Sequence, residues 1–201
     1  MSEKLKVGFI GLGAMGDPMA GHLHAAGLLS AVGNRSIAKA QLLAEKFSVN
    51  AAHATHFFSD CDVVVLCVSR DADVLENVNA LFGVLKAGAV VVDHSTVSMD
   101  TAKQAQKILA AKNIGFIDAP VSGGVEGARN GKLSIMVGGT AGNLEKVRPV
   151  LNAYAAKITH MGDTGAGQAT KAVNQVLVAG IAQAVCEGLA LGEKLGLKPE
   201  L

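Results

Sequence analysis

Residues 7–16 read Val-Gly-Phe-Ile-Gly-Leu-Gly-Ala-Met-Gly, an apolar run that ends in the pattern GxGxxG. In a dinucleotide-binding βαβ unit, the first glycine makes a tight turn, the second lets the backbone approach the pyrophosphate, and the third lets helix and strand pack closely. The pattern alone is weak, but here a helical run (17–26) and a second apolar run follow it at the expected distance. We therefore predict a dinucleotide site rather than a structural turn, with cofactor contacts from Gly11, Leu12, Gly13, Ala14, Met15 and Gly16.

The end of the second apolar run indicates which dinucleotide binds. Enzymes that bind NAD usually carry Asp or Glu there, which accepts a hydrogen bond from the ribose 2′-hydroxyl. This chain has Asn34, followed by Arg35 and Ser36. A guanidinium binds a 2′-phosphate through paired, charge-assisted hydrogen bonds, whereas a carboxylate repels it. These residues predict NADP as the cofactor in preference to NAD, with a solvated surface arginine as the alternative interpretation of Arg35.

Apolar strand-like runs alternate with helical runs as far as about residue 160. Continuous Val/Leu runs at 63–68 and 90–92 are typical of strands buried on both faces. The alternation predicts an α/β fold with a Rossmann-type, doubly wound, mostly parallel sheet in a domain of residues 1–162. The predicted strands are 6–10, 30–33, 49–51, 63–68, 89–93, 115–118, 133–137 and 157–160, and the helices between them are 37–47, 72–85, 98–111 and 143–154.

Composition excludes some classes of protein. The net charge of +1, without a basic block, argues against a nucleic-acid partner. Cys61, Cys67 and Cys186 are odd in number, widely spaced and flanked by apolar residues. They predict buried free thiols in a reducing compartment, hence a cytoplasmic protein, and no metal site. The apolar stretch near the N-terminus is explained by nucleotide binding, not by a signal peptide.

A different organisation begins at residue 163. A glycine-rich turn leads into a predicted helix, 168–194, which would be about 40 Å long. We interpret 163–201 as an interdomain helix and the start of a truncated, all-α C-terminal domain, with Pro199 beginning another helix. Polar residues interrupt the apolar segment 173–191, so we expect a buried helix rather than a membrane span.

Successive motifs identify a family. After the glycine motif come Asp-His-Ser-Thr at 93–96, Asp-Ala-Pro-Val-Ser-Gly-Gly at 118–124, and GxGxxxK at 165–171. In this order, over essentially the whole chain, they resemble the signatures of the β-hydroxyacid dehydrogenase family, which includes 3-hydroxyisobutyrate dehydrogenase, tartronate semialdehyde reductase and 6-phosphogluconate dehydrogenase. The resemblance implies reversible hydride transfer between a nicotinamide and the hydroxyl carbon of a short β-hydroxy acid.

The resemblance also assigns residues. It marks Lys171 as the general acid and base, and partial burial would lower the pKa of this ammonium towards the working pH. The small apolar neighbours Ala169, Ala172 and Val173 favour a buried helix face around it, against the alternative of a surface lysine. The remaining assignments are substrate contacts by Ser122, Gly123, Gly124, Asn174 and Gln175, and further cofactor contacts by Val68, Ser69 and Thr96.

The chain departs from the family pattern at one of these positions. Many relatives have two asparagines after the lysine, whereas this chain has Asn174 and Gln175, which changes the reach of the second amide. The Asn-Gln pair resembles some relatives that reduce tartronate semialdehyde. His94 is left out, because the family does not depend on a histidine there. We expect a small hydroxy acid or semialdehyde as substrate and a homo-oligomer at full length. An imine reductase and a non-catalytic nucleotide-binding fragment remain the alternatives.

Overall fold

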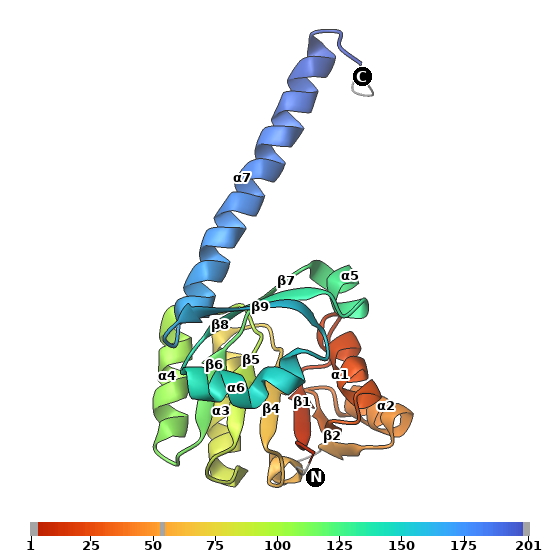
Figure 1. The fold of residues 1–201 in the computed structure, drawn as a ribbon. Helices are drawn as coiled ribbons and strands as arrows, with labels where there is room; N and C mark the ends of the chain where they lie inside the picture. The colour runs from red at the N-terminus through yellow and green to blue at the C-terminus, as the bar shows by residue number, and fades with distance from the viewer. Residues whose placement is uncertain (1–3, 53–54, 199–201) are drawn as a thin grey trace.

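The computed structural model describes residues 4–52 and 55–198, and in them a nine-stranded sheet forms the centre of the fold (Figure 1). The strands follow the order β3-β2-β1-β4-β5-β6-β8-β7, and β9 pairs with β8. The strands are β1 Val7–Ile10, β2 Leu29–Gly33, β3 Asn50–Ala52, β4 Val63–Leu66, β5 Val90–Asp93, β6 Gly115–Asp118, β7 Val121–Ser122, β8 Leu133–Gly138 and β9 Ala155–Gly162. The helices are α1 Gly16–Ala25, α2 Ile37–Phe47, η1 Thr55–Phe58, α3 Asp71–Val84, α4 Met99–Ala110, α5 Gly124–Arg129, α6 Ala141–Leu151 and α7 Ala166–Lys194.

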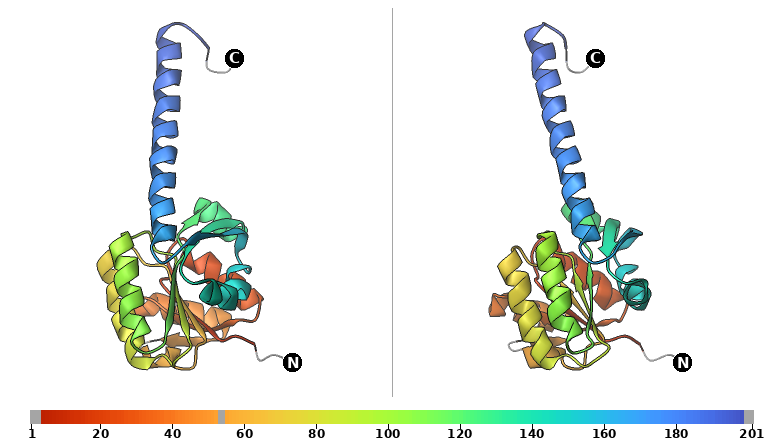
Figure 2. Two further views of the ribbon diagram at one scale, coloured as in Figure 1. Left: turned by 60° about the vertical axis from the view of Figure 1, so that its left-hand side comes forward. Right: turned by 90° about the vertical axis from the view of Figure 1, so that its left-hand side faces the viewer.

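The six strands in the order β3-β2-β1-β4-β5-β6 are all parallel, which is the Rossmann order. The predicted fold class is therefore confirmed. Alternate residues of β4 pack on opposite faces: Val63 and Val65 join the core beneath α1, α2 and α6, while Val64 and Leu66 join the core beneath α3 and α4. Figure 2 shows these helices as two layers on either side of the sheet. Burial on both faces explains why this strand is a continuous apolar run.

The register places the ends of four strands at one level. Ile10 pairs with Leu66, Leu66 with Asp93, and Asp93 with Asp118. The loops that follow β1, β4, β5 and β6 therefore leave the sheet together at its carboxyl edge. In an open α/β fold this edge, where the strand order reverses, is the place for a ligand.

The far end of the sheet was less well predicted. β8 runs antiparallel to β6 and β7, and β9 then runs parallel to β8. The two-residue strand β7, the short helix α5 and the 3₁₀ turn η1 have no counterpart among the predicted elements. Short elements such as these carry too little periodicity to be recognised in sequence.

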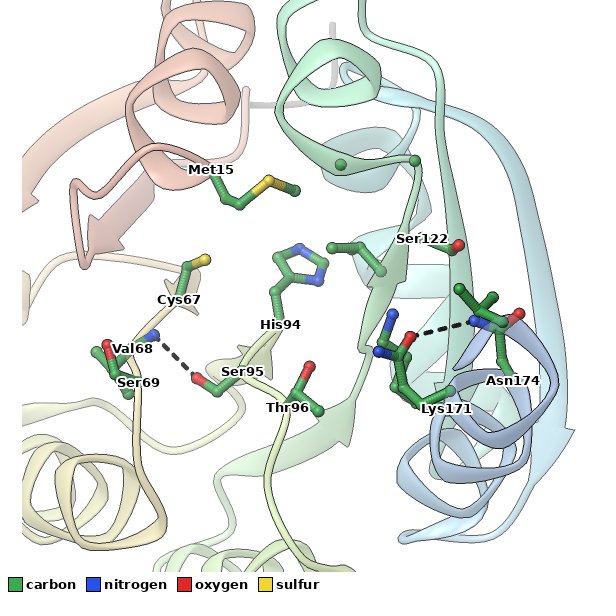
Figure 3. Close-up of a pocket in the computed structure, with 15 residues that line it drawn as sticks. Met15, Cys67, Val68, Ser69, His94, Ser95, Thr96, Ser122, Lys171 and Asn174 are labelled. Carbon is green, nitrogen blue, oxygen red and sulfur yellow. Dashed lines mark hydrogen bonds between the residues drawn. The ribbon is translucent and has the colours of Figure 1, made fainter. Parts of the chain in front are cut away.

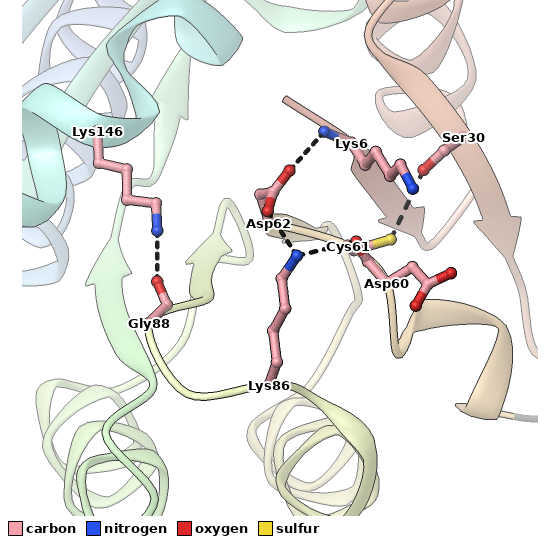
Figure 4. A network of polar contacts seen from close by, with 8 residues as sticks. All are labelled: Lys6, Ser30, Asp60, Cys61, Asp62, Lys86, Gly88 and Lys146. Carbon is pink, nitrogen blue, oxygen red and sulfur yellow. Dashed lines mark hydrogen bonds and ion pairs between the residues drawn. The ribbon is translucent and has the colours of Figure 1, made fainter. Parts of the chain in front are cut away.

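The opposite, amino-terminal edge of the sheet is closed by polar contacts (Figure 4). Asp62, directly before β4, accepts a hydrogen bond from the backbone N–H of Lys6 at 2.9 Å and pairs with the Lys86 ammonium at 2.7 Å. The Lys146 ammonium donates to the Gly88 carbonyl. Lys86 thus connects the end of α3 to the start of β4, and Lys146 connects α6 to the loop before β5.

The long helix α7 has 29 residues and leaves the sheet at a steep angle (Figures 1 and 2). Only its first turns contact the sheet, and Val176 and Ile181 are 73% and 64% exposed. The expectation of a buried helix was therefore wrong within the described residues. By length and composition α7 could cross a membrane, but its first turns belong to the pocket described below.

Two further expectations need correction or fall outside the structure. Cys186 is exposed because α7 projects from the sheet, and Cys67 is half-buried, so only Cys61 fits the prediction of a buried free thiol. The helix predicted to begin at Pro199 lies outside the described residues.

Candidate active site

Two adjoining pockets lie at the carboxyl edge of the sheet. One has a volume of about 480 Å³ and the other about 410 Å³, and they share Cys67, Val68 and Ser69 at the end of β4. The smaller pocket extends towards β2 and the larger towards α7. The shared residues place the two pockets side by side at the carboxyl ends of the strands.

The glycine motif forms one wall of this site. Gly11 has a φ of +97°, and a Cβ there would collide with the Cys67 carbonyl, while a Cβ on Gly16 would collide with the Gly11 carbonyl. A Cβ on Gly13, by contrast, would meet no atom within 4 Å. The turn and helix–strand packing therefore require Gly11 and Gly16, whereas Gly13 leaves its backbone open to a ligand. This is the arrangement that a pyrophosphate needs.

The residues predicted around this motif lie in different places. Gly11 and Gly13 line the smaller pocket and Met15 lines the larger one. The Leu12 side chain is fully buried in the core, and the Leu12 N–H donates to Asn34 Oδ1 at 3.1 Å. Leu12, Ala14 and Gly16 do not line either pocket.

The smaller pocket holds the residues predicted to select the cofactor. Asn34, Arg35 and Ser36 line it, and the Asn34 amide also donates to the Ser36 carbonyl at 3.2 Å. The sequence-based prediction missed four lining residues that come from η1 and α3, because nothing in the sequence placed these elements opposite β2. They are Phe58, Asp73, Glu76 and Asn77.

One of these additional residues carries a charge that is already paired. Asp73 accepts two hydrogen bonds from the Arg70 guanidinium, at 2.7 and 3.0 Å. The pKa of Asp73 is lowered by these hydrogen bonds. Two acidic residues, Asp73 and Glu76, line the pocket together with Arg35. Asp73 is already paired with Arg70.

The larger pocket brings together residues from five parts of the chain, including Met15 at the start of α1 (Figure 3). Lys171 and Asn174 approach it from α7, Ser122 from β7, Thr96 from the loop after β5, and Val68 and Ser69 from the loop after β4. Gly123, Gly124 and Gln175 line the same pocket. The lining residues that the sequence-based prediction left out are Cys67, His94, Ser95, Val121 and Val178.

Lys171 is 9% exposed, although its neighbours Ala172 and Val173 are exposed. Lys171 does lie on a buried face of the helix, but that face is formed with Gly167 and Gln168. The expected contributions of Ala172 and Val173 to this face were wrong, and Ala169 is half-buried. Among the described residues no hydrogen bond or ion pair of the Lys171 ammonium is found. Burial lowers its pKa, because desolvation disfavours the charged form.

The glycine pattern before Lys171 is explained by the packing of the first turn of α7. Asp118 accepts hydrogen bonds from the backbone N–H groups of Gly165 at 2.7 Å and Gln168 at 2.9 Å. A Cβ on Gly167 would lie 2.8 Å from the Asp118 carbonyl oxygen and 2.5 Å from that of Met136. A carboxylate at a helix N-terminus is stabilising, and here it anchors the turn that carries the lysine.

The His94 ring reaches the pocket but both of its nitrogens are engaged. Nδ1–H donates to the Ala119 carbonyl at 2.6 Å, because a carbonyl can only accept, and Nε2 accepts from the Tyr154 hydroxyl at 2.8 Å. Burial lowers the pKa of His94 to about 4. This histidine is therefore neutral near pH 7 and has no nitrogen left for a substrate.

These features fit a nicotinamide dinucleotide. The open Gly13 backbone suits a pyrophosphate, and the two pockets meet at Val68 and Ser69, where the halves of a dinucleotide would join. Among residues 4–52 and 55–198, no cluster of three His, Cys, Asp or Glu side chains is suited to a metal ion.

Comparison with known proteins agrees with this site. The family model described as the NAD binding domain of 6-phosphogluconate dehydrogenase matches residues 6–162. A second, described as the NAD-binding region of NADP-dependent 3-hydroxyisobutyrate dehydrogenase, matches residues 165–201. The chain is 40% identical to the 2-(hydroxymethyl)glutarate dehydrogenase of Eubacterium barkeri, covering 100% of this chain and 67% of that protein.

Solved structures give the same result. The 3-hydroxyisobutyrate dehydrogenase of Mycobacterium tuberculosis with L-serine has a TM-score of 0.93 at 32% identity, covering 98% of this chain and 68% of that one. Psf3 in complex with NADP⁺ and 2-OPP has a TM-score of 0.85 at 31% identity, covering 96% and 69%. An imine reductase of Myxococcus stipitatus, at 22% identity with a TM-score of 0.87, covering 98% and 69%, shares the fold.

The fold and these relatives define a nicotinamide-dependent oxidoreductase. The chain spans about two thirds of the length of the relatives it matches. It belongs to the β-hydroxyacid dehydrogenase family, whose members are NAD(P)-dependent hydroxyacid dehydrogenases.

Proposed function

We propose that this protein transfers a hydride between NADP(H) and a short β-hydroxy acid or semialdehyde of the 3-hydroxyisobutyrate or tartronate semialdehyde type. One observation carries the proposal. The buried amine of Lys171 shares a cavity with the Ser122–Gly124 turn and with the strand ends that border the dinucleotide pocket. A proton donor, an anion-binding turn and a cofactor site are the parts that reduction of a carboxylate-bearing aldehyde requires.

In the proposed mechanism the nicotinamide supplies or accepts the hydride. Lys171 donates a proton to the substrate oxygen as the carbonyl is reduced, and removes the hydroxyl proton in the reverse direction. The lowered pKa of the lysine brings proton transfer closer to working pH. Half-buried Ser122 offers a hydroxyl to the substrate carboxylate. Gly123 and Gly124, with φ of +128° and +61°, leave the adjoining turn uncovered by side chains, which suits a bound anion.

Two amides on α7 complete the proposed substrate site. Asn174 donates a hydrogen bond to the Gln175 side chain at 3.4 Å, and both residues line the pocket. We propose that they contact the substrate together, with the longer glutamine reaching further than asparagine would.

The preference for NADP rests on Arg35 at the end of β2. Its exposed guanidinium borders the smaller pocket, where a 2′-phosphate could accept two hydrogen bonds from it. Glu76 lines the same pocket, and its negative charge would repel a 2′-phosphate and so reduce the preference for NADP.

The test follows NADPH oxidation by the full chain with a panel of short semialdehydes, keto acids and cyclic imines. We expect turnover with a semialdehyde, and Lys171→Ala should lower kcat by about 10²- to 10⁴-fold, because general acid catalysis is lost. Lys194→Ala, at the far end of the same helix, is the matched control and should retain the parent rate. Faster turnover of imines than of semialdehydes would instead favour an imine reductase.

We further propose that the protein works in the cytoplasm on a small-molecule substrate, without a nucleic-acid or membrane partner. The proposed homo-oligomer is supported by the apolar residues exposed along α7. The proposed domain boundary at residues 162–163 is supported by the glycine-rich turn before this helix. Cell fractionation and limited proteolysis test the location and the boundary, respectively.

A further inference from the structure

Gln168 is a buried polar residue in the first turn of α7 that lines neither pocket. It is 3% exposed. Its Nε2 donates to the Ser95 carbonyl at 2.7 Å, and its Oε1 accepts from the Val97 N–H at 3.2 Å. A carbonyl can only accept and an N–H can only donate, so the orientation of this amide is fixed. The two contacts flank Thr96, which lines the pocket on the cofactor side.

The backbone of the same residue is fixed independently. The Gln168 N–H donates to Asp118 at 2.9 Å, and the close contacts of Gly167 leave no space for the first turn of α7 to shift. Lys171 follows three residues later, and residues at this spacing are neighbours on a helix surface. Movement of the Gln168 backbone therefore moves the lysine with it.

The contacts extend to a third loop. Ser95, whose carbonyl accepts from Gln168, also accepts a hydrogen bond through Oγ from the Val68 N–H at 2.9 Å. Figure 3 shows this contact beside Thr96. The Gln168 amide thus joins the loop after β5, which borders the larger pocket, to the helix that carries Lys171. Ser95 extends this connection to the loop after β4, which borders both pockets.

We propose that Gln168 is a positioning residue, which holds Lys171 at a fixed place relative to the Ser95–Val97 loop and couples binding of the dinucleotide to the first turn of α7. The coupling to catalysis rests on the proposed function, in which Lys171 moves the proton. A merely space-filling residue would need no polar contacts, and burying an amide is favourable only when its hydrogen bonds are made.

The first experiment does not require turnover. Amide hydrogen exchange is measured by mass spectrometry on the full chain, with and without saturating NADPH. In the parent, NADPH should slow exchange both in 95–98 and in 165–171. In Gln168→Met, which keeps the volume but loses both hydrogen bonds, protection should remain in 95–98 and fall at least threefold in 165–171. Gln183→Met, at an exposed glutamine further along α7, is the matched control and should behave as the parent.

The second experiment measures kinetics. Gln168→Met should lower kcat at least tenfold while the KM for NADPH changes less than threefold. Gln168→Glu retains an acceptor for the Val97 N–H but places a second acceptor against the Ser95 carbonyl, so it should lower kcat as Gln168→Met does. If Gln168→Met does not fold, Gln168→Glu provides both measurements. A purely structural role predicts lower thermal stability with kcat per folded molecule unchanged, which overturns the proposal.

The outcomes separate the two hypotheses. Equal NADPH-dependent protection of 165–171 in parent and Gln168→Met overturns the coupling, whatever the activity. Absence of turnover in the parent, with the protection pattern as expected, overturns the proposed function but supports the coupling. Failure of NADPH to bind the parent would overturn both.

Discussion

Replacing Gly167 by alanine tests the packing that places Lys171. The added methyl carbon would lie 2.5 Å from the Met136 carbonyl oxygen and 2.8 Å from that of Asp118. Both neighbours are backbone atoms in a sheet, so α7 must move, and such overpacking costs about 1–3 kcal/mol. Loss of the hydrogen bond from Gln168 to the Asp118 carboxylate would add about 1.5–3 kcal/mol. We expect the free energy of unfolding to fall by about 2.5–6 kcal/mol.

The measurement is urea-induced unfolding followed by circular dichroism. Gly142→Ala is the matched control, since a Cβ at this exposed helical glycine would meet no atom within 4 Å. It should leave stability unchanged or raise it by about 0.5–1 kcal/mol, because alanine loses less backbone entropy in a helix. A Gly167→Ala protein as stable as the parent would show that the first turn of α7 can shift freely. Close packing against β6 and β8 would then not be the reason for the glycine before Lys171.

Three further predictions concern the cofactor, pH and association. Arg35→Ala should weaken NADP binding about ten- to hundredfold by removing charge-assisted hydrogen bonds, with little effect on NAD; equal losses in fluorescence titrations would exclude this role. Burial raises the pKa of Asp93 to about 7 from 3.8, so its contribution to stability is lost as pH rises from about 4 to about 7. Asp93→Asn should therefore gain stability relative to the parent over that range, and a difference independent of pH in denaturation midpoints would contradict the assignment. Because Ile181 and its apolar neighbours on α7 are exposed, the chain should self-associate in a concentration-dependent manner and Ile181→Glu should weaken this; a monomer at all concentrations by light scattering would refute it.

The local sequence determined the first part of the fold and much of the site. An apolar strand, a glycine pattern and a helix in immediate succession leave few alternatives for residues 7–26, because their constraints act within a few residues. The buried strands, which read as valine runs, could be recognised for the same reason. The motif residues predicted after these strands, Val68, Ser69 and Thr96, line one cavity because parallel strands bring their carboxyl ends to one edge.

The tertiary structure alone decided what surrounds those residues. Lys171 is buried because the first turns of α7 pack against the sheet, while Cys186 is exposed because the rest of α7 projects from it. The acidic wall opposite Arg35 and the contacts of Gln168 also depend on segments that meet only after folding. Periodicity and motifs report the chemistry of each segment, but burial, hydrogen-bond partners and pKa depend on what packs against it. These properties arise only from contacts between residues far apart in the chain.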